Sequence, residues 1–366
     1  MNKLTASVIR QLVVGMLFVA GGLTAVIWLS QSLRFVEMII DHGASAGMFL
    51  QLTMLLVPSL LIIALPVSLF IVIIFIFSKM TADRELVVMS ATGLSPMQIA
   101  KPVLIVAGGT VLLSYILNLY VLPESYRMFE ELKWHIRFNY SQYLLEEGRF
   151  NSVGDKVTVY VRERSADNSL KGIFVHDARD TAAPVTIMAK RGSLIRSGDS
   201  AKIIAFDGSR QQLDTTTGKY SMLFFDRYSL GLDEFQQSAE VRTRDSRELS
   251  VGELFRVDEL GDIPEHDFDK FRVEGHKRLI GPLTNVAFAA TALVCLFAGG
   301  FTRRNQTKRI VAAVVVILVM QLLVLGAEKI SARNAAMVPL LYAAIGIPTI
   351  GSLLLLLKPP QIRLLN

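Results

Sequence analysis

Apolar residues along the chain gather in runs long enough to cross a lipid bilayer. A helix needs about 20 apolar residues to span a hydrocarbon layer of about 30 Å. Six runs meet or approach that length, at residues 8–33, 49–77, 103–122, 279–300, 310–327 and 335–357. The pattern predicts a polytopic α-helical membrane protein with six transmembrane helices, three before and three after a large polar region.

The first two runs have unusual lengths. The apolar stretch 11–29 is longer than the core of a typical signal peptide, and no small-residue cleavage motif closes it, so we interpret it as a first transmembrane helix. The second run is overlong and contains Pro58 and Pro66. Because proline removes a helix hydrogen bond, this run should kink or project beyond the bilayer.

The polar region between the third and fourth runs changes pattern partway. Residues 124–148 carry apolar and aromatic positions at helical spacing, which predicts a continuation of the third span. After Gly148, short alternating segments rich in Val, Ile, Thr, Phe and Tyr follow, separated by turn residues such as "DTTTGK" at 214–219. This is typical of an inserted all-β domain, a sandwich or jelly roll.

The expected organisation therefore has three parts. Residues 1–122 hold transmembrane helices 1–3 with a short helix at about 81–93, and residues 277–366 hold helices 4–6. Residues 123–276 form the polar region, with the β domain at about 148–232. Within its last part, "SVGE" at 250–253 is a capping-box motif that predicts a helix start.

Composition agrees with a membrane protein. Hydrophobic residues make up 52% of the chain, charged residues 19%, and the mean hydropathy is +0.44. Cys295 is the one cysteine, so neither an intrachain disulfide nor a multi-cysteine zinc site can form. The positions of the basic residues matter more than the net charge of +6, because Lys and Arg set the orientation of membrane proteins. We expect no role in nucleic-acid binding.

Basic residues in short connections predict the orientation. The connections on one side of the membrane are rich in Lys and Arg, whereas the first connection carries Glu37 and Asp41 and one Arg. The positive-inside rule then puts both termini and the 81–102 stretch in the cytoplasm, and the β domain outside it. Lys329 and Arg333 fall on the opposite face as a minority signal. The basic residues on the cytoplasmic face are Lys3, Arg10, Lys79, Arg84, Lys101, Arg303, Arg304, Lys308 and Arg309.

Catalytic motifs are missing from the sequence. The Gly218–Lys219 pair lacks the upstream glycine of a phosphate loop, so ATP hydrolysis by this chain is not expected. No H-E-x-x-H motif occurs, and the G-x-S-x-G match "GASAG" at 43–47 lies in a connection between two predicted spans rather than after a strand, so it predicts no nucleophile elbow. The histidines are scattered, and we expect no metal centre, no cofactor and no catalytic residue. The histidines are His42, His135, His176, His266 and His276.

The stretch "TADRELVVMSATGLSPMQIAKP" at 81–102 is the most informative polar segment. Asp83, Arg84 and Glu85 fall in the first turn of a predicted short helix, where carboxylates favour the positive end of the helix dipole. Gly93 should end this helix, and Ser95 with Pro96 should start the next one. Leu86, Met89 and Leu94 recur on one face.

That short surface helix has two interpretations. It can be an interfacial helix that only smooths the turn between spans two and three. Alternatively, it can be a coupling helix that docks on a soluble motor subunit, which would explain carboxylates in a connection otherwise rich in positive charge.

The order of six spans with a β domain in the middle, together with "ADRELVVMSATGLSPMQIAKP", resembles the lipopolysaccharide export permease family of Gram-negative bacteria, LptF and LptG. The resemblance covers essentially the whole chain. The stretches "WLSQSLRFVEMIIDHG" and "YVRERSADNSLKGIFVHDARD" look more like the LptF side, and the LptG side is the alternative.

The resemblance implies an assembly. In such an exporter the short helix docks on a dimeric ATPase subunit, LptB, and Glu85 matches the coupling glutamate. A second permease subunit, LptG, would pair with this chain, and the β-jelly-roll domain would pass lipopolysaccharide to the bridge proteins LptC and LptA. The expected coupling residues are Asp83, Arg84, Glu85, Met89, Gly93 and Leu94.

The resemblance also gives the outward-facing cations a role. Lipopolysaccharide carries anionic phosphates, so a cavity needs apolar walls and a few cations at its outer rim. Arg34 and Lys329, with Arg333 as a weaker candidate, are the expected substrate-binding residues. The alternative is that Arg34 and Lys329 reach ordinary lipid headgroups, or pair with Glu37 and Glu328.

Two interpretations from other classes of protein remain open. A secondary transporter or channel would work without an ATPase and would carry an ionisable residue within a span. A scaffold that organises partners through its β domain would be insensitive to charge reversal at Arg34 and Lys329.

Overall fold

In the computed structural model the chain folds into two compact units. The helical unit contains residues up to 35, 49–131 and everything from 244 onward, and the second unit contains 36–48 and 132–243. The structure describes residues 3–42, 45–136, 147–152, 156–165, 169–178, 180–197, 200–213, 218–231, 244–261, 263–298 and 306–357.

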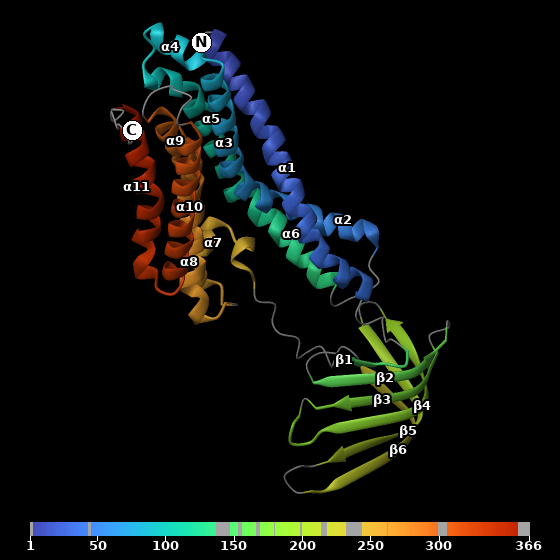
Figure 1. Ribbon diagram of the computed structural model, residues 1–366. Helices are drawn as coiled ribbons and strands as arrows, with labels where there is room; N and C mark the ends of the chain where they lie inside the picture. Colours follow the sequence, from blue (N-terminus) through green and yellow to red (C-terminus); the bar gives the residue numbers. More distant parts are fainter. Residues whose placement is uncertain are drawn as a thin grey trace. The chain divides into compact units, whose positions relative to one another are not determined.

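Six helical segments of the structure are long and apolar enough to cross a membrane, which confirms the predicted spans. Shorter helices precede, connect or extend them (Figure 1). The main helices of the six spans are α1 (Lys3–His42), α3 (Val57–Ala82), α5 (Pro96–Ile116), α9 (Thr284–Phe297), α10 (Gln306–Ser331) and α11 (Val338–Leu357), and the fourth span runs over Glu265–Phe297. The shorter helices are α2 (Ala46–Met54), α4 (Glu85–Ala91), α6 (Leu122–His135), α7 (Val251–Phe255) and α8 (Phe268–Ile280).

The overlong second run is broken into two helices. α2 ends at Met54 and α3 begins at Val57, with Pro58 in the first turn of α3, where a missing N–H is tolerated. Trp28 of α1 donates its indole N–H to the carbonyl oxygen of Thr53 at 3.0 Å. Pro66 lies inside α3, which continues past it. The expected departure from a straight helix is thus a break ahead of Pro58.

The third span continues as a helix beyond its apolar run, as its periodicity predicted. A π-helical turn, Leu117–Val121, joins α5 to α6. Asn118 in this turn donates to the carbonyl oxygen of Ser114 at 3.0 Å, and Asn285 of α9 donates to the hydroxyl of Ser114, also at 3.0 Å. The side-chain N–H groups of both buried amides are therefore hydrogen-bonded where α5 meets α9, which lowers the cost of burying them in a bilayer.

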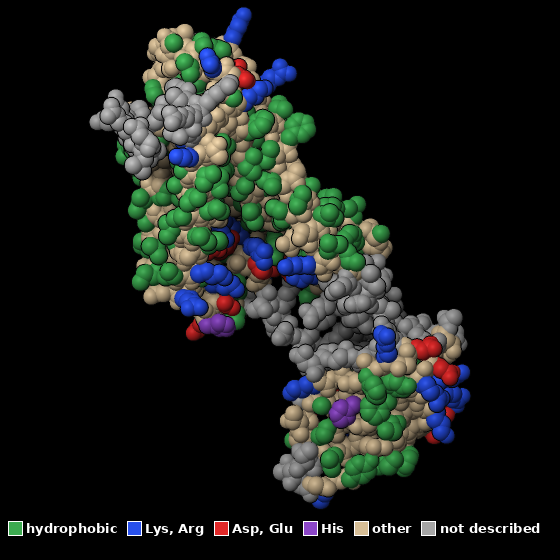
Figure 2. All heavy atoms as spheres, in the orientation of Figure 1, with side chains coloured by type: hydrophobic (Ala, Val, Ile, Leu, Met, Phe, Trp, Pro, Cys, Tyr) green, Lys and Arg blue, Asp and Glu red, His purple; other side chains and the backbone are tan. Residues whose placement is uncertain are grey.

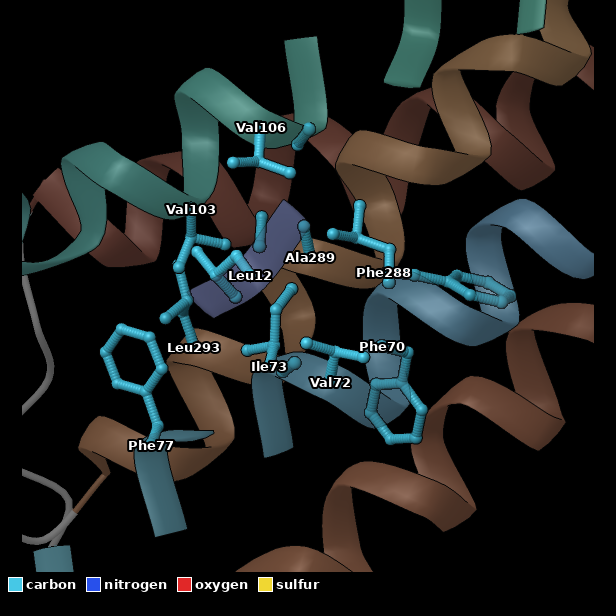
Figure 3. Close-up of a cluster of buried hydrophobic side chains, with 14 of the residues drawn as sticks. Leu12, Phe70, Val72, Ile73, Phe77, Val103, Val106, Phe288, Ala289 and Leu293 are labelled. Atoms are coloured by element: carbon cyan, nitrogen blue, oxygen red, sulfur yellow. The ribbon is translucent and has the colours of Figure 1, made fainter. Parts of the chain in front are cut away.

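The core of the helical unit lies between α1, α3, α5 and α9. Figure 3 shows Leu12, Ile73, Val103 and Leu293 converging from these four helices, and all four are fully buried. α9 contributes several alanines to the same cluster. Small residues let helix backbones approach closely, which is how membrane helices gain packing energy.

The outer helices leave their flanks exposed. On the face that Figure 2 shows, hydrophobic side chains cover the flank of the helical unit, and Lys and Arg gather at its two ends. The most apolar window is 22% buried in the first and fifth spans, against 61% in the fourth. The flanks of α1 and α10 therefore face lipid or another subunit.

The inserted all-β domain is confirmed as one six-stranded antiparallel sheet whose strands are neighbours in chain order (Figure 1). This order is a meander, and the crossing connections of a Greek-key jelly roll do not occur among the described strands. The strands are β1 (Phe150–Ser152), β2 (Val157–Arg164), β3 (Ser169–Asp177), β4 (Val185–Ser197), β5 (Ser200–Leu213) and β6 (Tyr220–Gly231).

Alternation along the strands buries one face of this sheet. Val157, Val159 and Val161 of β2 are at most 1% exposed, because side chains two residues apart point to the same face. Segments 201–206 and 209–214, which the sequence pattern divides into separate strands, form the single strand β5 as far as Leu213. The expected hairpin connection follows β5, and residues 214–217 lie outside the described residues.

Candidate functional site

The segment between α3 and α5 folds differently at its start from the expectation. Asp83 caps the end of α3, its N–H bonding to the carbonyl oxygen of Lys79 at 2.8 Å. Arg84 adopts a left-handed backbone with φ +60°, which breaks the helix. Asp83 and Arg84 thus lie outside α4, and Glu85 alone provides the carboxylate of its first turn.

α4 is held by one face and exposes the other. Leu86 is 1% exposed within the main core, and Met89 and Leu94 pack against that core. Of the residues expected to couple to a motor, Met89 and Leu94 are therefore placed to position the helix rather than to touch a partner. Glu85 is exposed, and Val88 is 62% exposed. These two lie three residues apart, so they form one outward stripe.

Both predicted boundary signals around α4 are present in the structure. Gly93 adopts φ +85° just after α4 and is exposed. Ser95 caps α5, accepting from the N–H of Gln98 while the Gln98 side chain accepts from the N–H of Ser95. α4 is thus followed by a left-handed glycine and by the capping box that starts α5, while the left-handed Arg84 precedes it.

The start of α10 lies at the same end of the helical unit. The side-chain amide of Gln306 donates to the carbonyl oxygen of Ser78, near the end of α3, at 2.9 Å. The guanidinium of Arg309 is buried and donates to the carbonyl oxygen of Leu296 in α9 at 3.4 Å. The helix that leads into α4 is therefore hydrogen-bonded directly to α10.

The outward cations predicted from the sequence are exposed. Lys329 lies in the last turn of α10 and Arg333 in the turn that follows, and both side chains are exposed. Arg34 of α1 is exposed as well, while the side chain of Glu37 lies outside the described residues.

Glu328 does not pair with Lys329, which corrects the alternative drawn from the sequence. Its carboxylate contacts the ammonium of Lys277, on α8, at 2.8 Å. Successive helix residues point about 100° apart, so Glu328 faces α8 while Lys329 faces outward. Within the described ranges Lys329 has no carboxylate partner.

The chain returning from the β domain contacts the helices at this same end. We call residues 244–260 the return segment. Arg278 of α8 is 1% exposed and donates to the carbonyl oxygens of Leu249 at 2.6 Å and Ser246 at 3.0 Å. The guanidinium of Arg247 lies 4.2 Å from the ring centroid of Tyr126 in α6. Figure 1 shows α7 and α8 at the end of the helical unit opposite α4.

Carboxylates stabilise this return segment. Burial alone would raise the pKa of Asp245, but hydrogen bonds from the side chain and backbone of Arg247 outweigh it and hold that pKa below its ordinary value. The expected capping box at Ser250 and Glu253 is present. Burial alone would raise the pKa of Glu253, but the hydrogen bonds from the backbone and side chain of Ser250 hold it below its ordinary value.

Sequence reasoning missed two groups of residues. Val87 and Val88 were not selected as contact residues, although their position between Leu86 and Met89 puts them off the buried face. Lys277 and Gln306 were missed because their partners are distant in sequence. Among the described residues no three His, Cys, Asp or Glu side chains are arranged to hold a metal ion.

Comparison with known proteins agrees with this architecture. The family model described as lipopolysaccharide export system permease LptF/LptG matches residues 7–358. The uncharacterized protein RP871 of Rickettsia prowazekii (strain Madrid E) is 28% identical over 299 residues, 80% of each chain. The lipopolysaccharide export system permease protein LptF of Escherichia coli (strain K12) is 23% identical over 228 residues, 62% of each chain. Because the family model spans all six apolar helices and the β domain, the chain belongs to the LptF/LptG family of lipopolysaccharide export permeases, multi-pass proteins of the inner membrane.

Proposed function

We propose that this chain is the LptF-type permease subunit of an ABC-type exporter that extracts lipopolysaccharide from the outer leaflet of the inner membrane. The observation that carries the proposal is α4, a helix of seven residues anchored by Leu86 and exposing Glu85 and Val88. A helix held on one side and apolar on the other suits docking in a groove of another subunit. A phosphate-loop motif is missing from the sequence, so that subunit supplies the ATPase.

In the proposed orientation, α4 and both termini are cytoplasmic and the β domain is periplasmic. The ATPase is an LptB-type dimer, and α4 transmits its closure to the spans through α3. The hydrogen bond from Gln306 to Ser78 supports this route, because it joins the end of α3 to the start of α10.

The lipid side of the proposal concerns α1 and α10. These helices leave most of their apolar surface unburied, which suits a cavity shared with an LptG-type second permease. Arg34, Lys329 and Arg333 would attract the phosphates of lipopolysaccharide at its rim, since charge-assisted bonds to phosphate are strong. The lipid would then pass to the β domain and to LptC- and LptA-type bridge proteins.

Two variants of Glu85 test the coupling role. We expect Glu85→Ala and Glu85→Lys to reduce ATP-dependent release of lipopolysaccharide from proteoliposomes at least tenfold, with the fold unchanged because Glu85 is exposed. Glu259→Ala is the control, since this glutamate is also exposed but follows α7 at the opposite end. Undiminished ATPase association and lipid release in both Glu85 variants would refute the docking assignment.

A further inference from the structure

Within the helical unit, α8 makes polar contacts in two directions. On one side Arg278 binds the carbonyl oxygens of the return segment. On the other side Lys277 reaches Glu328 in the last turns of α10. α8 is thus the element that connects the return from the β domain to the outer end of α10.

Charges alternate across this contact. The ammonium of Lys277 lies 2.8 Å from the carboxylate of Glu328 and 3.4 Å from that of Glu274. Glu274 in turn lies 3.6 Å from the guanidinium of Arg278. Two carboxylates and two cations balance, and no net charge remains in the cluster. Glu274 is 16% exposed and Glu328 28%, so both carboxylates are partly desolvated and depend on their cations.

Two further contacts fix α8, one against the turn after α10 and one against α11. The carboxylate of Asp269 accepts from the N–H of Ala335 at 3.1 Å. His276 and the hydroxyl of Tyr342 in α11 share a hydrogen bond at 3.0 Å. Lys277 lies next to His276, so its ion pair with Glu328 lies beside contacts that hold α8 in place without it.

The arrangement affects the exposed cations directly. Lys329 follows Glu328 in sequence, and Arg333 lies in the next turn. With Glu328 paired to Lys277, its negative charge is neutralised on the side facing α8, and Lys329 and Arg333 stay available to an external anion.

We propose that Lys277 is a positioning residue for phosphate recognition: it neutralises Glu328 and draws that carboxylate towards α8, so that Lys329 and Arg333 at the outer end of α10 stay available to the phosphates of lipid A. The inference rests on the proposed function and adds a residue that does not itself touch the lipid. Without Lys277 the carboxylate of Glu328 would be unpaired beside Lys329. It would compete for that cation and repel phosphate.

The test uses the full-length permease complex with its ATPase in nanodiscs and measures binding of bisphosphorylated lipid A. We expect Lys277→Met to weaken binding about three- to tenfold, the range typical of one unpaired charge at a partly exposed site. Glu328→Gln should bind like the unmodified protein, and Lys277→Met with Glu328→Gln should restore binding. Dephosphorylated lipid A should bind equally to all variants.

The matched control is Lys270→Met, which removes an exposed lysine of the same helix whose contact is Asp267 at 3.9 Å. A merely structural role for Lys277 predicts that the double variant is no better than Lys277→Met, and that result would overturn the proposal. Lys329→Met separates the two levels of the argument. If it weakens binding while Lys277→Met does not, the positioning role is wrong; if it has no effect, the lipid-binding role of this edge is wrong as well.

Discussion

Arg278 donates through Nη1 to the carbonyl oxygen of Leu249 at 2.6 Å, across 29 residues of sequence. The same guanidinium donates through Nη2 to the carbonyl oxygens of Ser246 and Arg247 at 3.0 and 3.1 Å. One buried side chain therefore satisfies three backbone acceptors in a segment with little regular structure of its own. Such a segment depends on this side chain, because buried carbonyls without donors are costly.

Replacing Arg278 by Met should loosen the return segment. The variant leaves three carbonyl oxygens without their donor, and we expect local stability to fall by about 3 kcal/mol. Faster hydrogen exchange in residues 244–260 and a lower unfolding temperature would measure this loss. Arg272→Met is the control, because that guanidinium makes an exposed contact with Asp258 at 3.4 Å, worth less than about 1 kcal/mol. Equal effects of the two variants would contradict the prediction.

Substitutions on the buried and the exposed face of α4 should differ in how much stability they cost. Leu86→Ala removes a side chain that is 1% exposed, so we expect a loss of about 2–4 kcal/mol in the free energy of unfolding. Val88→Ala changes a residue that is 62% exposed and should cost less than about 0.5 kcal/mol.

Binding of the ATPase gives a second test of the exposed face of α4. Val88→Asp places a charge on the proposed docking face and should weaken co-purification of the ATPase while leaving thermal unfolding unchanged. An ATPase that binds Val88→Asp normally would argue that the exposed face of α4 meets lipid headgroups instead.

Gln306→Leu should reduce coupling with little effect on folding. The substitution removes the bond to the carbonyl oxygen of Ser78, whose net contribution to stability is about 1 kcal/mol. We expect a measurable drop in lipid released per ATP hydrolysed, because α3 and α10 would no longer move together. Thr307→Val is a suitable control, since Thr307 is the exposed neighbour. Unchanged stoichiometry in Gln306→Leu would show that this bond is purely structural.

The six spans and the β domain could be predicted because each leaves a local pattern. A span needs an uninterrupted apolar run, and a half-buried strand needs alternation, as in Val157, Val159 and Val161. The capping boxes at Ser95 and Ser250 are equally local. Orientation and the roles of Glu85, Arg34 and Lys329 stay predictions.

The departures from expectation have physical reasons. Apolar periodicity carries no information on backbone φ, so the left-handed Arg84, after which α4 begins at Glu85, was not predictable. One alternative from the sequence paired Glu328 with its neighbour Lys329, whereas the structure pairs it with Lys277, 51 residues away. Sequence reasoning finds helix neighbours readily, but a contact between helices depends on how they pack.

The return segment should lose its order in acid through Asp245. Because the folded pKa of this carboxyl is held below its ordinary value of about 4, its ion pair with Arg247 contributes stability that is fully present above that value. The contribution is lost as the pH falls through the lowered folded pKa, when the carboxylate is protonated. Hydrogen exchange of residues 244–253, corrected for the intrinsic rate, should therefore increase as the pH falls below about 4, the ordinary pKa of Asp. Asp245→Asn should exchange faster at neutral pH and lose this acid transition, and a transition that persists in Asp245→Asn would assign the titration to another carboxyl, with Glu253 the first to examine.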